Sequence, residues 1–172
     1  MIDGGARLDI VPGDPDLRLR SADPGDKPFT RQLFREARSR QFIAAGLSGP
    51  ILEQVLEQQF RGQTNGYAVQ FPDAISLIVT RDGGAIGRLL LHCASGHWHI
   101  IDIALLPAAC GRGAGAKILD ALEASARQQS VGALTLTVLA SNVRARRFYL
   151  RHGFVEREAA GAAYIAMRKD IG

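Results

Sequence analysis

Hydrophobic positions in the first part of the chain recur with the period of a helix. Apolar residues return every three or four positions over residues 29–42 and again over residues 51–60. This spacing predicts two amphipathic helices, each with one face turned inward. A short alternation of apolar and polar residues at 16–20 predicts a strand before them.

The middle of the chain changes to the pattern of β-structure. Three runs rich in β-branched and aliphatic residues follow one another, separated by short turns that contain glycine. Such spacing predicts an antiparallel meander. Its strands are expected at residues 75–80, 85–93 and 97–106.

After Pro107 the pattern alternates between helix and strand. An amphipathic stretch at 113–129 predicts a helix, and the near-continuous β-run at 131–139 predicts a strand. A strand, a helix and a second strand in this order predict a parallel pair with a right-handed connection. Asn142 can cap the next helix, which Gly153 ends. Two last strands are expected at residues 154–158 and 162–167.

Together, these elements predict an α/β fold. We expect a mixed, mostly antiparallel sheet of about seven strands, with one parallel pair and helices on both faces. Residues 1–15 carry several glycines and prolines without periodicity, and they predict a loose leader. Because no linker interrupts the remainder, residues 16–172 are expected to form a single domain.

Composition places the chain among soluble globular proteins. It is 47% hydrophobic and 22% charged, and no apolar run approaches the roughly 20 residues of a membrane helix. The first residues lack the basic flank and the apolar stretch of a signal peptide. We therefore expect a cytoplasmic protein that has no membrane partner.

Positive charge leaves two interpretations open. The net charge is +4 and the sequence pI is about 9.5. Arginines gather on the last predicted helix, where they form either a solvated face or a field that attracts a small polyanion or nucleic acid. The aromatic residues of that helix lie on its apolar side, so nucleic acid is not expected as a partner. The arginines are Arg144, Arg146, Arg147 and Arg151.

The stretch Cys110-Gly-Arg-Gly-Ala-Gly-Ala-Lys117 is the most informative one. Glycines before a helix allow close backbone approach, and a helix N-terminus offers unpaired N–H groups, which together suit a phosphate. A flexible turn is the simpler alternative. A P-loop is excluded because Ala116 and Ile118 replace its second glycine and its hydroxyl residue. A dinucleotide fingerprint is disfavoured because the next strand ends without an acidic residue.

Three segments of the second half carry a family resemblance. They are Ile101-Asp-Ile-Ala-Leu-Leu-Pro107, Gly111-Arg-Gly-Ala-Gly115 and Asn142-Val-Arg-Ala-Arg-Arg-Phe-Tyr-Leu-Arg-His-Gly-Phe154. In this order they resemble the GNAT superfamily of N-acetyltransferases, whose last motif reads N-x-x-A-x-x-[FL]-Y-x-x-x-G-F. Cys110 stands where that family usually has Arg or Gln, in a loop whose backbone amides make most of the contacts.

The resemblance implies that the parallel pair is splayed and that acetyl-CoA lies in the gap between residues 97–106 and 131–139. The first strand would pair with the pantetheine arm, the glycine loop would wrap the pyrophosphate, and the arginines would attract the nucleotide end. The implied cofactor-binding residues are Ile103, Leu105, Cys110, Gly111, Arg112, Gly113, Ala114, Gly115, Ala116, Asn142 and Phe148.

The implied reaction is direct attack of a primary amine, from a small molecule or a peptide, on the thioester. Tyr149 matches the family's general acid, although a lone tyrosine on an inward helix face would be interpreted as core. Asp102 lies between isoleucines and is a candidate general base, or else a structural hydrogen-bond partner of a nearby loop. Glu156 and Glu158 are further candidates for the base.

The acceptor side carries no motif. Residues 29–60 and 62–72, together with the far ends of the strands, are expected to form the acceptor pocket. The alternative function is a non-catalytic acyl-CoA sensor on the same fold, which would bind the cofactor without turnover. The sequence leaves a homodimer open.

Histidines and cysteines do not predict a metal site. His97 and His99 would share a strand face, but no acidic or cysteine ligand at suitable spacing completes a site, so no metal is expected. Cys93 is predicted as a core thiol and Cys110 as a loop thiol.

Overall fold

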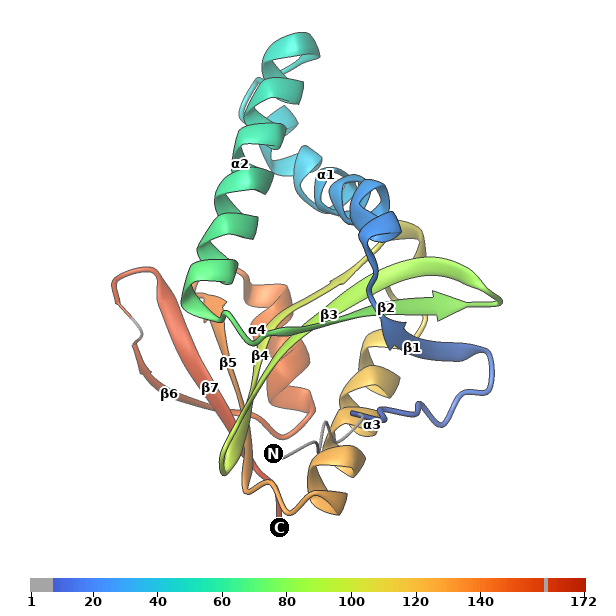
Figure 1. Ribbon diagram of the computed structural model, residues 1–172. Helices are drawn as coiled ribbons and strands as arrows, with labels where there is room; N and C mark the ends of the chain where they lie inside the picture. The colour runs from blue at the N-terminus through green and yellow to red at the C-terminus, as the bar shows by residue number, and fades with distance from the viewer. Residues whose placement is uncertain (1–7, 160) are drawn as a thin grey trace.

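A seven-stranded mixed sheet lies at the centre of the computed structural model, which describes residues 8–159 and 161–172 (Figure 1). The strands are β1 Leu17–Ser21, β2 Ile75–Arg81, β3 Gly84–Ala94, β4 His97–Leu105, β5 Ala133–Leu139, β6 Val155–Ala159 and β7 Tyr164–Asp170. Their order in the sheet is β1-β2-β3-β4-β5-β7-β6. β4 and β5 run parallel, whereas the other neighbouring pairs are antiparallel.

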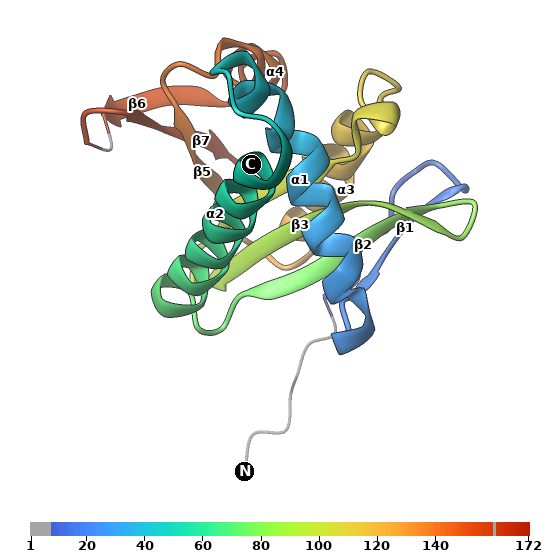
Figure 2. The ribbon, with the colours of Figure 1, turned by 90° about the horizontal axis from the view of Figure 1, so that it is seen from above.

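Two pairs of helices cover the sheet, one pair on each face (Figures 1 and 2). They are α1 Lys27–Ala44 with α2 Gly49–Gln70, and α3 Ala114–Gln128 with α4 Val143–Arg151. Short 3₁₀ turns at Pro24–Asp26 and Pro107–Ala109 lead into α1 and toward α3. The predicted fold class is therefore confirmed, with its parallel pair at the predicted place.

Successive side chains along a strand point to opposite faces of the sheet, and apolar side chains are found on both faces. Leu77 and Val79 belong to the large core cluster beneath α3, whereas Ile78 between them is buried outside that cluster. α3 contributes Ile118 and Leu122, both fully buried, and each such side chain stabilises the fold by roughly 1.5–3 kcal/mol. This attachment holds the start of α3, and the loop before it, in a fixed position.

α1 and α2 form a hairpin that is held together by its own contacts. The rings of Phe34 and Phe60 meet edge to face with centroids 5.6 Å apart. Two ion pairs also join the helices: Arg31–Glu57 and Arg35–Glu53. The tip of the hairpin projects beyond the sheet (Figure 1). This end of the molecule is therefore built largely by a separate supersecondary unit.

The largest departure from the predicted elements is the length of α2. Its predicted end at residue 60 is wrong, because the helix continues to Gln70. Apolar periodicity stops at Phe60, but Gln63 and Tyr67 continue the four-residue spacing and line a cavity. A search for an apolar stripe misses a helical turn whose inward face is polar.

Residues 8–15 are more firmly attached than the prediction of a loose leader implied. Ile10 is buried in the core cluster. Asp14 accepts a hydrogen bond of 2.6 Å from the Lys117 ammonium and lies 3.6 Å from the Arg81 guanidinium. The prediction is wrong for this part, and residues 1–7 lie outside the described residues.

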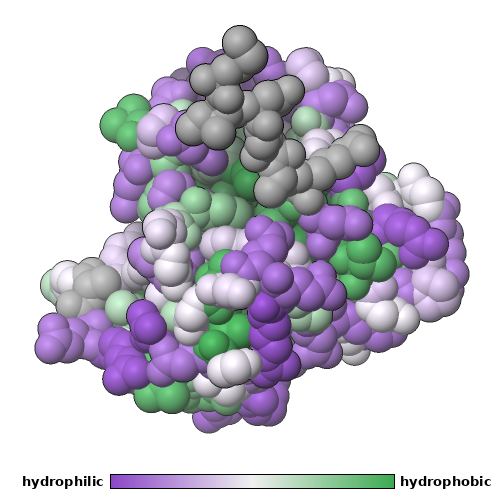
Figure 3. All heavy atoms as spheres, turned by 60° about the horizontal axis from the view of Figure 1, so that its bottom comes forward, coloured by the Kyte–Doolittle hydropathy of each residue, from purple (hydrophilic) through white to green (hydrophobic). Residues whose placement is uncertain are grey.

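The outer surface is mostly polar on the face opposite the helical tip. Figure 3 shows this face covered mainly by hydrophilic residues, with hydrophobic ones in small separate patches. Among the residues that the structure describes, none of the helices combines the length and the apolar character needed to span a membrane.

Candidate active site

The parallel strands β4 and β5 separate part of the way along their length. Their pairing begins at His97 with Ala133 and ends at Ile100 with Leu136. The remainder of β4 keeps its pairing with β3, as far as Leu105 opposite Gly87. The edge of β4 that faces β5 is thus free of strand pairing over residues 101–105, as the family resemblance implied.

A β-bulge in β4 accompanies this separation. Across the β3–β4 ladder, Leu91 pairs with Ile100 and Leu90 pairs with Asp102, so Ile101 is an extra residue. A bulge bends its strand and increases the local twist. It therefore directs the end of β4 away from β5 and sets which face Asp102 occupies.

A cleft occupies the gap between the strands. A cavity of about 660 Å³ lies between β4, β5 and the hairpin α1–α2. A neighbouring cavity of about 590 Å³ shares Arg38 and Asp102 with it. A third, of about 410 Å³, lies at the glycine loop and shares Asn142 and Tyr149 with the first. The glycine loop and the helical hairpin thus open onto one connected cleft of ligand-binding size.

The glycine loop presents backbone donors at its side of the cleft. Gly111 and Gly113 have φ values of 76° and 78°, a left-handed conformation that suits glycine. The first bond of α3 runs from the Lys117 N–H to the Gly113 carbonyl, so the preceding N–H groups lack an acceptor within the helix. These groups belong to Ala114, Gly115 and Ala116.

Gly115 has a second role that the sequence pattern did not reveal. A Cβ atom at this position would lie 3.2 Å from Cζ of Phe148, so the missing side chain lets α3 and α4 approach closely. Phe148 also meets the rings of Tyr149 and His152, at centroid distances of 5.3 and 4.5 Å. Phe148 is therefore both a cleft residue and a packing residue.

The arginines of α4 differ in their environment. Arg144 and Arg151 line the cavity at the glycine loop. Arg146 instead binds the carboxylate of Glu156 at 2.8 Å and the carbonyl of Ala140 at 2.9 Å. The predicted attraction of an anion therefore concerns two of these arginines, while Arg146 connects α4 with β6.

Tyr149 lies where the cavities meet. Its ring meets those of Phe148 and Phe154, at centroid distances of 5.3 and 5.6 Å. Burial, reinforced by the nearby negative charge of Asp102, raises the pKa of the Tyr149 phenol well above its ordinary value. The hydroxyl therefore keeps its proton at neutral pH and can serve as a donor.

Asp102 has a charged partner that the sequence did not reveal. Its carboxylate accepts a hydrogen bond of 3.0 Å from Nη2 of Arg88, on the adjacent strand β3. Across the ladder, Arg88 pairs with Ala104, which places it diagonally opposite Asp102. The expected apolar surroundings of Asp102 and its expected loop partner are both replaced by this ion pair. Beside it, Arg88 Nε is buried and has no hydrogen-bond partner among the described residues.

The remaining predicted side chains occupy defined places. The Asn142 side chain accepts a hydrogen bond of 3.1 Å from the Ala145 N–H, which confirms its capping role. The ion pair with Arg146 lowers the pKa of Glu156, so this carboxylate is held in its charged form. Glu158 is exposed at the sheet edge.

The two cysteines lie on the surface. Cys93 was predicted in the core, but it is exposed near the end of the β3–β4 hairpin. Cys110 is exposed on its loop, as predicted, and lines the cleft with its sulfur 3.8 Å from the Leu105 carbonyl oxygen.

The histidines of β3 and β4 surround an aromatic ring. Phe71 lies 5.4 Å from the ring of His92 and 5.5 Å from that of His99. His99 Nδ1 is 2.9 Å from the Thr135 hydroxyl. Within residues 8–159 and 161–172, no three His, Cys, Asp or Glu side chains gather in a way that could hold a metal ion.

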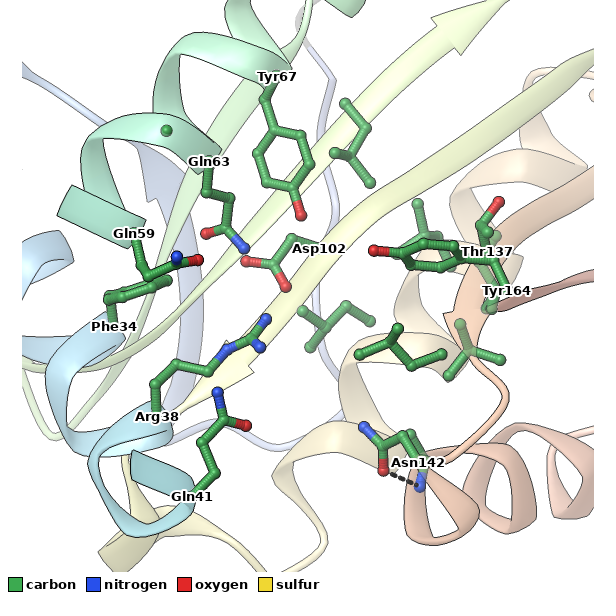
Figure 4. Close-up of a pocket in the computed structure, with 18 of the residues that line it drawn as sticks. Phe34, Arg38, Gln41, Gln59, Gln63, Tyr67, Asp102, Thr137, Asn142 and Tyr164 are labelled. Atoms are coloured by element: carbon green, nitrogen blue, oxygen red, sulfur yellow. Dashed lines mark hydrogen bonds between the residues drawn. The ribbon is translucent and has the colours of Figure 1, made fainter. Parts of the chain in front are cut away.

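The opposite side of the cleft consists of residues that no motif indicated. Arg38, Gln63 and Tyr67 point from the helical hairpin toward Asp102 (Figure 4). Further polar residues line the same cavity: Gln41, Gln59, Thr137 and Tyr164. The four-residue spacing of Gln59, Gln63 and Tyr67 is the one signal that could have identified this face of α2.

Comparison with known proteins agrees with the fold. The profile of the acetyltransferase (GNAT) family matches residues 32–154. The chain therefore belongs to this family. A search of curated protein sequences gave no significant match.

Solved structures share the fold at low sequence identity. The PaiA N-acetyltransferase from Thermoplasma acidophilum, in complex with coenzyme A, has a TM-score of 0.65 and 17% identity over 90% of this chain and 98% of that one. The ribosomal-protein-S18-alanine N-acetyltransferase from Escherichia coli has a TM-score of 0.64 and 19% identity over 91% and 94%. An acetyltransferase from Thermus thermophilus has a TM-score of 0.66 and 19% identity over 94% and 99%.

Proposed function

We propose that this protein is an N-acetyltransferase that transfers the acetyl group of acetyl-CoA to a primary amine of a small molecule or peptide. The observation that carries the proposal is the meeting of three features in one cleft: the gap between β4 and β5, the glycine loop, and Tyr149. Each feature has a distinct task in acyl transfer from a long, anionic donor.

The residues of the cleft fit acetyl-CoA along its length. The free edge of β4 at Ile103 and Leu105 suits the amide groups of pantetheine, and the N–H groups of Ala114, Gly115 and Ala116 suit the pyrophosphate. Hydrogen bonds to a charged group contribute about 1.5–3 kcal/mol each. Arg144 and Arg151 would face the phosphorylated nucleotide end.

The reaction requires two proton movements. Bound acetyl-CoA supplies a thioester carbonyl carbon; a bond to the amine nitrogen forms there and the bond to sulfur breaks. The Tyr149 hydroxyl would donate a proton to the departing sulfur and regain one from solvent. Asp102 would accept the proton that the nitrogen loses, directly or through water, while Arg88 orients its carboxylate.

The test is an assay of acetyl-CoA turnover with a panel of primary amines, in which the release of the free thiol is measured. We expect acetyl-CoA to raise the melting temperature and at least one amine to give thiol release well above hydrolysis. Stabilisation by acetyl-CoA without turnover by any amine would favour the acyl-CoA sensor instead. Absence of cofactor binding would contradict both functions.

A further inference from the structure

Three charged side chains line the two cavities between the sheet and the helical hairpin. They are Arg38, Arg88 and Asp102. Arg88 and Asp102 are 3.0 Å apart and neutralise one another. Arg38 adds a further positive charge. Counted over the described residues, the side chains that line these cavities therefore carry one more positive than negative charge.

Arg38 differs from the other arginines of α1 beside it. Arg31 and Arg35 face α2, where each has a glutamate partner. Arg38 forms no ion pair with any described residue, and its guanidinium is directed into the cavity (Figure 4). Its carbon atom Cζ lies 5.7 Å from the centre of the Phe34 ring, a stacking that limits the orientations of the guanidinium.

The remaining polar groups around Arg38 are neutral. Gln41 of α1, with Gln59 and Gln63 of α2, offers amide donors and acceptors on the same wall. No glutamate among the described residues lines either cavity, so a polyamine would find no carboxylate besides that of Asp102 on these walls. A planar guanidinium beside amide groups is instead suited to bind a carboxylate through two parallel hydrogen bonds.

We infer that the acceptor is a small molecule that carries both the reacting amine and a carboxylate, and that Arg38 binds this carboxylate. The inference rests on the proposed function, because it assigns the acceptor of that reaction. Arg38 and Asp102 both line one cavity of about 660 Å³, which has room for an amino acid with its amine toward Asp102 and its carboxylate toward the hairpin. Arg38 is thus a specificity-determining residue.

The experiment compares amino acids with their amides. Glycine, β-alanine, 4-aminobutyrate and lysine are each paired with the corresponding carboxamide, and rates are expressed per concentration of neutral amine. Because charge-assisted hydrogen bonds are worth more than neutral ones, we expect at least one acid to exceed its amide in kcat/KM by about 10- to 100-fold. Arg38→Gln should remove most of this preference by raising KM with little change in kcat.

Matched variants separate recognition from folding. Arg35→Gln removes an arginine three positions away that is paired outside the cleft, and it should leave the preference unchanged. Arg38→Lys should keep part of the preference, whereas Arg38→Glu should shift it toward diamines such as cadaverine. Calorimetric titration of coenzyme A should give the same affinity for all of these variants.

Binding measurements keep the two proposals apart. Calorimetry of the acids and amides on the protein–coenzyme A complex reports carboxylate recognition even when no amine is turned over. Tighter binding of an acid, lost in Arg38→Gln, would support the inference even if the proposed reaction failed. Equal binding and equal rates of acids and amides, or a preference for diamines by the unaltered protein, would overturn it.

Discussion

The two sides of the cleft expose different parts of the chain. The glycine loop and the free edge of β4 present backbone groups, whereas the α1–α2 hairpin presents side chains such as Arg38 and Gln63. Backbone recognition constrains conformation, and therefore leaves glycines at fixed spacing. Side-chain recognition constrains only a few scattered positions. This difference explains why one side carries a recognisable sequence motif and the other carries none.

The largest expected effect concerns the residue at the meeting of the two sides. Tyr149→Phe should lower kcat by about 10²–10⁴-fold, because the departing sulfur loses its proton donor. Calorimetry should show unchanged affinity for coenzyme A. Tyr164→Phe, which removes a hydroxyl elsewhere in the same cavity, should cost less than about tenfold in kcat. Equal effects of the two variants would contradict the assignment of Tyr149 as general acid.

Replacing a glycine by alanine on each side of the cleft should change the free energy of unfolding in opposite directions. Gly113→Ala places a Cβ at a φ of 78°, which should lower the free energy of unfolding by about 1–2 kcal/mol and weaken coenzyme A binding severalfold. Gly66→Ala lies inside α2 with open space around it, and it should raise that free energy by about 0.5–1 kcal/mol. Urea denaturation and calorimetry measure both. A stabilising Gly113→Ala would show that the loop does not need its left-handed conformation.

Acid should loosen the attachment of the hairpin before the core unfolds. The Arg20 guanidinium, with hydrogen bonds of 2.7 Å to each carboxylate oxygen, and the Asp23 N–H lower the pKa of Asp26 to about 2. A carboxyl group with an unfolded pKa of about 3.9 stabilises the fold above that pH. This stabilisation should be lost as the pH falls from about 4 to about 2.

The measurement is the urea midpoint as a function of pH. Asp26→Asn should lower the midpoint at pH 7 and flatten its decline between about pH 4 and pH 2. Asp73→Asn, at an exposed turn after α2, should leave the curve unchanged. A decline that is as steep in Asp26→Asn as in the unaltered chain would contradict the role of this ion pair.

The smallest expected effect concerns the unusual residue of the loop. Cys110→Arg introduces the side chain that the family usually carries, at an exposed position. Because exposed ion pairs contribute only about 0–1 kcal/mol, coenzyme A should bind at most about fivefold more tightly. Cys110→Ser should bind as the unaltered chain does. A gain of a hundredfold would mean that side chains, rather than backbone amides, dominate recognition on this side.

The sequence predicted those features that depend on local rules. The glycine loop before α3, the Asn142 cap and the strand periods each follow from short-range sterics or hydrogen bonding, and the structure contains all of them. The family profile and the fold confirm the GNAT assignment. The roles of Tyr149 and Asp102 stay predictions until variants are assayed.

The features that escaped prediction depend on pairs that are distant in sequence or on polar inward faces. Arg88 and Asp102 meet only through the strand register, which no pattern within one strand reveals. The last turns of α2 carry glutamine and tyrosine where a helix against an apolar core would carry leucine. The pattern of its strand predicts Cys93 in the core, but α3 does not extend over the end of that hairpin (Figure 1).

The bulge at Ile101 makes the number of residues in β4 as important as their identity. Deletion of this one residue would restore an unbroken ladder with β3, in which Asp102 still lies opposite Leu90 and Ile103 still lies opposite Leu89. The strand would instead lose the bend and the added twist of the bulge, so the end of β4 would continue beside β5 and close the gap between them. A single inserted residue thus decides whether β4 and β5 stay side by side or leave a gap between them.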